Sequence, residues 1–134
     1  LLGVEVRIAC PVGYEPNPLV IKKAYEIYKN KNLLKITNNP YEAVEGANVL
    51  YTDVWSSMGE ENKKEEKDKD FNGFTIDIDL VKKARKNAIV LHCLPAYRNK
   101  EITDEVIDSK NSRIFEQAEN RMHVQQALLS CLLS

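Results

Sequence analysis

Apolar runs and amphipathic stretches follow one another in a regular order at the start of the chain. Val4–Cys10 is rich in β-branched residues and stops at Pro11, which predicts a strand followed by a loop. Asn17 then offers a helix cap and Pro18 a first helical position, and the apolar stripe behind them predicts a helix that ends near Asn30–Asn32. The first unit is therefore predicted to be a strand and an amphipathic helix.

The same order returns in the next stretch. The pattern predicts strands at Leu33–Thr37 and Ala47–Thr52, with a short helix between them at Tyr41–Glu45, capped by Asn39 and Pro40. Strands that alternate with helices are typical of a parallel sheet with right-handed crossovers. We therefore predict an α/β fold with an open parallel sheet and flanking helices.

The second half of the chain continues this fold. Asp79–Lys86 is predicted to form a cationic amphipathic helix, and the unbroken apolar run Ala88–Leu91 a buried strand. Thr103–Asp108 predicts another short helix, and Arg113–Phe115 an extended segment. Asn120 is then expected to cap a final helix, whose strongly apolar tail needs a covering surface.

A dense run of charges separates the two halves. Ten of the eleven residues in Glu60–Asp70 are charged. Such a run is usually a solvated helix, and nothing in it indicates an acidic or basic docking tail. We expect it to form a mobile flap.

The composition indicates one globular domain. The chain has 134 residues, of which 43% are hydrophobic and 29% charged, with a net charge of -1. This balance creates no overall field that would favour nucleic acid or an anionic membrane. No apolar run approaches the roughly 20 residues that a membrane helix needs, so we expect a soluble, cytoplasmic protein. The chain opens on Leu1 without a methionine and looks cut from something longer.

The cysteines do not form a disulfide framework. Cys10, Cys93 and Cys131 are few and far apart, and none belongs to a C-x-x-C pair, so reduced thiols are expected. Cys10 and Cys131 lie on apolar elements and are interpreted as core residues. A metal site is weakly supported, because the two histidines and three cysteines lack the close spacing of zinc ligands.

Polar residues follow two predicted strands directly. Asp53 comes after Ala47–Thr52, and Cys93 comes shortly after Ala88–Leu91. In an open parallel sheet, ligands bind outside the carboxyl ends of the strands, so both side chains are expected at one edge. A carboxylate and a thiol facing one crevice could hold an amine substrate.

Each candidate also has an ordinary explanation. Asp53 could be a turn residue or a helix cap, and Cys93 could be a small buried apolar residue. His92 is a poor base for Cys93, because neighbouring residues of an extended segment point to opposite faces. Arg121 would follow the Asn120 cap, where helix N–H groups favour an anion, or it could pair with a nearby glutamate on the surface.

Three motifs give the chain a close resemblance to the C-terminal part of an ornithine carbamoyltransferase. They are D-V-W-S-S-M-G at 53–59, H-C-L-P at 92–95 and E-Q-A-E-N-R at 116–121. The resemblance covers essentially all of the chain and keeps the family's order and spacing. It implies transfer of the carbamoyl group of carbamoyl phosphate to the δ-amine of L-ornithine, giving L-citrulline and phosphate, with neither cofactor nor metal.

The resemblance also implies roles for individual residues. Asp53 would bind the α-amino end of ornithine, and Ser57 and Met58 would close over it. Cys93 would lie beside the substrate amine, and the backbone of Cys93 and Leu94 would meet the carbamoyl group. Arg121 would help to hold carbamoyl phosphate. The resemblance further implies a cis peptide bond before the proline of H-C-L-P.

Several family motifs do not occur in the chain. The Ser-Thr-Arg-Thr phosphate loop, the His-Pro-x-Gln segment and the Gly-x-Gly-Asn-Asn turn are missing. We therefore expect residues 1–119 to form an ornithine-binding α/β domain without its first strand and helix. Residues 120–134 should form a helix that packs on an absent N-terminal domain. The isolated chain should be inactive, and the full-length protein should be a homotrimer.

Two alternatives stay open at this point. A sister transcarbamylase that uses putrescine or an acylated ornithine shares H-C-L-P and A-E-N-R, although the Ser57–Gly59 loop favours ornithine. The aspartate enzyme fits less well, because it has proline where Cys93 stands. A non-catalytic binding or assembly domain of the same fold is the other alternative, since the phosphate motifs are missing.

Overall fold

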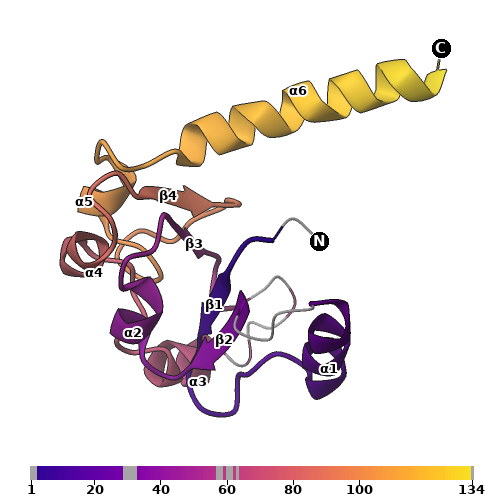
Figure 1. Cartoon of the computed structure of the whole chain (residues 1–134). Helices are drawn as coiled ribbons and strands as arrows, with labels where there is room; N and C mark the ends of the chain where they lie inside the picture. Colours follow the sequence, from indigo (N-terminus) through magenta and orange to yellow (C-terminus); the bar gives the residue numbers. More distant parts are fainter. Residues whose placement is uncertain (1–2, 29–32, 57–58, 60–61, 63, 134) are drawn as a thin grey trace.

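The computed structural model describes residues 3–28, 33–56, 59, 62 and 64–133. Strands and helices alternate through most of this part of the chain, as the sequence pattern predicts (Figure 1). The elements are β1 (Val6–Ala9), α1 (Pro18–Ile27), β2 (Leu34–Thr37), α2 (Pro40–Val44), β3 (Val49–Thr52), α3 (Lys64–Asp70), α4 (Ile78–Lys83), β4 (Ile89–His92), α5 (Asp104–Ile107) and α6 (Ile114–Leu133).

Local capping chemistry explains where the first helices begin. The Asn17 side chain accepts a hydrogen bond from a first-turn N–H of α1 at 2.8 Å, and Pro18 occupies the first helical position. Asn39 and Pro40 repeat this arrangement in α2, so both predicted caps are confirmed. Helix α4 is capped by Asp77 and therefore begins slightly earlier than its pattern predicts.

The strands form two parallel pairs. β1 pairs with β2, and β3 pairs with β4 in a register that places Thr52 opposite His92. The predicted α/β fold with parallel strands is therefore confirmed. Within the described part of the chain, however, the two pairs do not join into one sheet.

A groove of about 590 Å³ lies between the two pairs. Alternate residues of β1, including Arg7, line one side of it, and β3 lines the other. The Arg7 guanidinium also donates to the carbonyl of Glu45 at 2.6 Å, which ties β1 to the end of α2. The edges of β1 and β3 that face this groove have no strand between them. This agrees with the expectation that the chain lacks one strand of the family's sheet.

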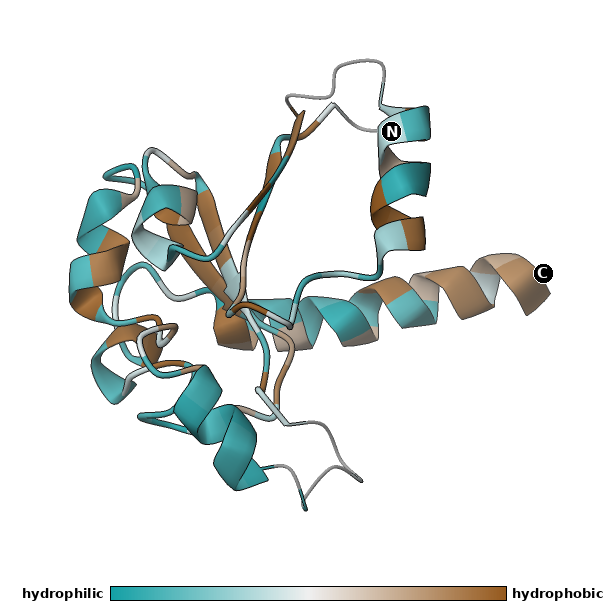
Figure 2. Cartoon of the chain, turned by 90° about the horizontal axis from the view of Figure 1, so that it is seen from below, coloured by the Kyte–Doolittle hydropathy of each residue, from teal (hydrophilic) through white to brown (hydrophobic). Residues whose placement is uncertain are grey.

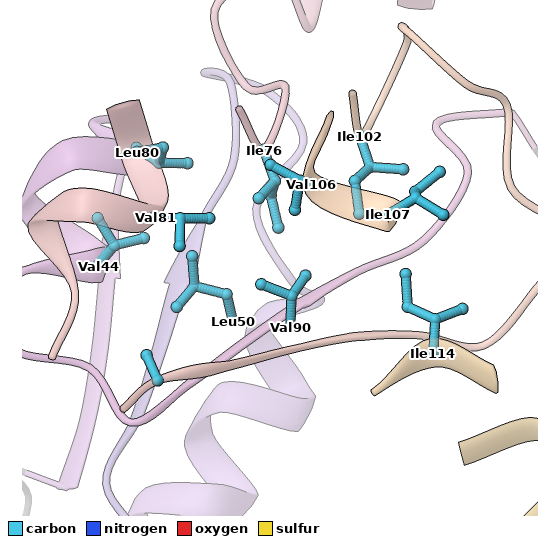
Figure 3. Packing of buried hydrophobic residues seen from close by; sticks show 11 residues of the cluster. Val44, Leu50, Ile76, Leu80, Val81, Val90, Ile102, Val106, Ile107 and Ile114 are labelled. Atoms are coloured by element: carbon cyan, nitrogen blue, oxygen red, sulfur yellow. The ribbon is translucent and has the colours of Figure 1, made fainter. Parts of the chain in front are cut away.

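The apolar core packs around β3 and β4 (Figure 3). Val90 of β4, Ile102 and Ile114 are each 0% exposed. The cluster consists of Val44, Leu50, Ile76, Leu80, Val81, Ala88, Val90, Ile102, Val106, Ile107 and Ile114. Because this core surrounds both strands, it fixes their carboxyl ends relative to each other.

The last helix begins earlier than expected. α6 starts at Ile114, so the predictions of an extended segment at Arg113–Phe115 and of a cap at Asn120 are wrong. Ile114 is fully buried, and the Arg113 carbonyl accepts the first helical hydrogen bond at 2.9 Å. A single exposed Asn costs a helix less than about 1 kcal/mol, which is too little to interrupt good helix formers on either side.

Much of α6 runs away from the rest of the molecule (Figure 1). Its second half is largely apolar and exposed (Figure 2). Met122, Val124, Leu128, Leu129, Leu132 and Leu133 are all more than half exposed. Among the described residues, no helix is long and apolar enough to cross a membrane.

Candidate functional site

Asp53 and Cys93 lie together at the carboxyl ends of β3 and β4. The two strands end side by side, with Thr52 opposite His92, and the next residue of each strand enters the same space. A carboxylate oxygen of Asp53, the Cys93 sulfur and a ring nitrogen of His92 all lie within 4.8 Å of one another. The structure therefore brings together the two groups that the strand ends predicted.

The surroundings of Cys93 keep its thiol protonated. Burial raises the pKa of the Cys93 thiol, and the hydrogen bond and negative charge of Asp53 raise it further. The Tyr51 hydroxyl acts in the opposite direction, because it donates to the sulfur. At neutral pH, the thiol can therefore donate its hydrogen to the Asp53 carboxylate.

We predict that Cys93 reacts slowly with iodoacetamide near neutral pH. Only the thiolate attacks, and the raised pKa means that it forms at a higher pH than for an ordinary thiol. Asp53→Asn removes the neighbouring negative charge, lowers the thiol pKa and should speed the reaction at any one pH. Alkylation of the Cys93 peptide, followed by mass spectrometry at neutral and alkaline pH, measures both rates. Equal rates in the two proteins would contradict the prediction.

A buried pair behind Cys93 holds the loop in place. His92 and Glu101 are each 1% exposed, and His92 Nε2 lies 3.1 Å from Glu101 Oε1. The same carboxylate oxygen accepts the Tyr97 N–H at 2.6 Å. His92 Nδ1 accepts the Leu94 N–H at 2.8 Å, so Nε2 must carry the ring hydrogen and donate it to Glu101.

These contacts remove His92 as a base for Cys93, because both of its ring nitrogens are engaged. They also hold the H-C-L-P turn, in which Leu94 has a φ of 57°. The Leu94–Pro95 peptide bond is cis, which confirms the prediction. The Leu94 N–H is used within the turn, so Leu94 can offer a ligand only its carbonyl oxygen.

Two further side chains connect this site to α6. Gln117, in the first turns of α6, accepts the His92 N–H through Oε1 at 3.1 Å. Its Nε2 donates to the Tyr51 hydroxyl at 3.2 Å. Sequence analysis did not select Tyr51, Glu101 or Gln117. Gln117 belongs to the E-Q-A-E-N-R motif, but nothing in the sequence marks any of the three as a neighbour of Cys93.

Asp53, His92 and Cys93 are also of the residue types that bind metal ions. An ion bound to His92 would have to displace either the Leu94 N–H or the Glu101 carboxylate. Because the protein already satisfies both ring nitrogens, the group is better suited to an amine than to a metal.

The loop after β3 is anchored by aromatic packing. Trp55 stacks on Phe71 at a centroid distance of 5.6 Å, and Phe71 follows the charged helix α3. α3 in turn reaches the loop after β4, where Asp68 and Lys100 form an ion pair at 2.5 Å. The expected charged helix is present at residues 64–70, whereas the predicted contacts of Ser57 and Met58 lie outside the described residues.

Arg121 lies on α6, four residues after Gln117. It lies in the third turn of α6 and not in a first turn. The prediction that free N–H groups at a helix start would help Arg121 to bind an anion is therefore wrong. With Met122 and Gln125 it lines a shallow concave face of that helix. The glutamates expected as alternative partners contact other residues, since Glu119 lies 3.3 Å from His123.

The fold and the site define an α/β domain that can hold a small amine at the carboxyl edge of parallel strands. The family model "Aspartate/ornithine carbamoyltransferase, Asp/Orn binding domain" matches residues 1–132. The chain belongs to this family.

Individual relatives agree with this assignment. The chain is 83% identical to the ornithine carbamoyltransferase of Prochlorococcus marinus subsp. pastoris over 133 residues, which is 99% of the chain and 43% of that protein. It resembles the structure of the anabolic ornithine carbamoyltransferase of Campylobacter jejuni with a TM-score of 0.87, at 42% identity over 97% of the chain and 43% of that structure.

A third relative also has a similar structure. The ornithine carbamoyltransferase structure from Pyrococcus furiosus gives a TM-score of 0.82 at 45% identity, over 95% of the chain and 41% of that structure. The chain therefore spans less than half the length of the relatives that it matches.

Proposed function

We propose that the full-length protein transfers the carbamoyl group of carbamoyl phosphate to the δ-amine of L-ornithine, and that this chain supplies the ornithine side of the site. The observation that carries the proposal is the common location of Asp53 and Cys93, within 4.8 Å, at the ends of two parallel strands. The family of the chain and its named relatives support ornithine as the amine.

In this proposal Asp53 binds the α-ammonium group of ornithine. A carboxylate at an exposed strand end can accept charge-assisted hydrogen bonds from an ammonium group. The δ-amine must attack in its neutral form, so the site has to orient the amine beside Cys93 and keep water away from it. The Leu94 carbonyl can accept a hydrogen from the NH₂ of the carbamoyl group.

The carbamoyl phosphate side of the site is proposed to lie mainly outside this chain. Arg121 would contribute to it once α6 is packed against a second domain, and the exposed apolar second half of α6 supports such packing. The division into residues 1–119 and 120–134 stays a proposal, and it falls within the continuous helix α6. A homotrimeric full-length enzyme and an inactive isolated chain belong to the same proposal.

The test uses a chimera in which this sequence replaces the segment that it matches in the Prochlorococcus marinus enzyme. We expect the chimera to form citrulline from ornithine and carbamoyl phosphate, and the isolated chain to show negligible turnover. Putrescine and N-acetylornithine are offered in parallel reactions, and a preference for either would favour a sister transcarbamylase. A folded chimera that carbamoylates none of the three amines would contradict the proposal and favour a binding domain.

A further inference from the structure

Gln117 is placed so that it controls the direction of a hydrogen-bond chain that ends at Asp53. Its side-chain amide bridges the two strands of the site, with Oε1 on the His92 N–H of β4 and Nε2 on the Tyr51 hydroxyl of β3. The Asp53 carboxylate lies within 4.8 Å of the Cys93 sulfur, and both Asp53 and the Tyr51 hydroxyl are near enough to change the pKa of the thiol by hydrogen bonding, Asp53 raising it and Tyr51 lowering it. Four side chains from three separate elements are thus connected in series.

The direction of this chain follows from its first member. The His92 backbone N–H can only donate, so the amide oxygen of Gln117 must face it and the NH₂ must face Tyr51. The Tyr51 oxygen then accepts from Gln117, which leaves its own hydrogen for the Cys93 sulfur. The thiol hydrogen in turn is left for Asp53, and each bond in such a chain polarises the next.

We propose that Gln117 is a positioning residue, which directs the Tyr51 hydroxyl hydrogen toward the Cys93 sulfur and thereby sets the hydrogen bonding of the thiol. It would touch no substrate itself. The inference deepens the proposed function, because its catalytic consequence rests on Cys93 lying beside the substrate amine. Its effect on the thiol can be measured without any turnover.

Gln117→Glu is the informative substitution, since it has nearly the same shape. One carboxylate oxygen can still accept the His92 N–H, while the other accepts the Tyr51 hydroxyl hydrogen instead of donating to its oxygen. Tyr51 then turns its hydrogen away from Cys93. We expect alkylation of Cys93 at a fixed alkaline pH to slow by about two- to ten-fold, the range of a single hydrogen bond.

The new negative charge could slow the reaction by itself, so the substitution is repeated in a Tyr51→Phe background. If Gln117 acts through Tyr51, Gln117→Glu should change the alkylation rate much less in that background. An equal slowing with and without the Tyr51 hydroxyl would show a simple charge effect and overturn the proposal. Asn87→Asp, the same amide-to-carboxylate change at an exposed residue just before β4 and so at the opposite end of that strand from Cys93, is the matched control and should leave the rate unchanged.

All variants are made in the full-length chimera, and the Cys93 peptide is followed by mass spectrometry. Circular dichroism checks that each variant is folded, and Gln117→Met serves as a second, uncharged variant that removes both amide contacts. It should slow alkylation by less than Gln117→Glu, because it frees the Tyr51 hydroxyl without reversing it; an equal or larger slowing would count against the proposal.

If the unsubstituted chimera does not carbamoylate ornithine, the proposed function fails while the thiol rates still decide the role of Gln117. If it is active, Gln117→Glu should also shift the pH profile of kcat.

Discussion

Asp53→Asn in the chimera is expected to raise the KM for ornithine by about 10- to 150-fold, because a hydrogen bond to a charged group contributes about 1.5–3 kcal/mol. The asparagine has nearly the same size and keeps one oxygen acceptor, so the change removes mainly the negative charge that faces the α-ammonium group. If this contact is equally strong in the ground state and the transition state, KM should rise while kcat changes little. Steady-state kinetics with varied ornithine and saturating carbamoyl phosphate measure both constants.

The control for this prediction is Asp79→Asn. Asp79 is an exposed carboxylate on α4 that pairs with Lys82 at 2.9 Å, and its replacement should leave both kinetic constants unchanged. An unchanged KM for ornithine in Asp53→Asn would show that this carboxylate does not bind the substrate. A fall in kcat alone would assign Asp53 to the chemical step instead.

Glu101→Ala is expected to weaken the structure around the H-C-L-P turn by about 1–3 kcal/mol, the usual cost of leaving a buried hydrogen-bond donor without its acceptor. The substitution leaves the ring N–H of the buried His92 without an acceptor, and it also removes the acceptor of the Tyr97 backbone N–H. Hydrogen exchange of peptides that cover the turn should become faster, because it reports local opening. Mass spectrometry of deuterium uptake in the chimera measures the change.

Glu101→Gln provides the matched comparison. Its amide oxygen can still accept from one or both of the same N–H groups, so the loss of protection should be clearly smaller than in Glu101→Ala. Glu66→Ala on the exposed charged helix α3 is the negative control. If Glu101→Ala exchanged no faster than Glu66→Ala, the buried pair would have no structural role in holding the turn.

Local patterns were sufficient for most of the fold. The caps at Asn17 and Asn39 and the alternation of apolar runs with amphipathic stretches predicted the strands and the first two helices, because these signals act between residues close in sequence. The start of α6 was the clearest failure. Asn120 has the chemistry of a cap, but burial of Ile114 and good helix formers after it let the helix begin earlier.

Some residues of the site could be predicted from local patterns and others could not. Asp53 and Cys93 could be predicted as neighbours, since a parallel sheet brings the residues after its strands to one edge. Glu101 and Gln117 could not be predicted, because they reach the site through a loop and a helix whose positions depend on packing. Tyr51 lies within a strand and was interpreted as part of its apolar run.

The sequence by itself determined the element types, the α/β class, the family and the pairing of a carboxylate with a thiol. Only the tertiary structure decided that His92 is held by Glu101, that Arg121 lies in the third turn of α6 and not in its first, and that Gln117 joins β3 to β4. The physical reason is that capping and periodicity depend on neighbouring residues. A hydrogen bond between residues 25 or 66 positions apart exists only after the core has packed and brought them together.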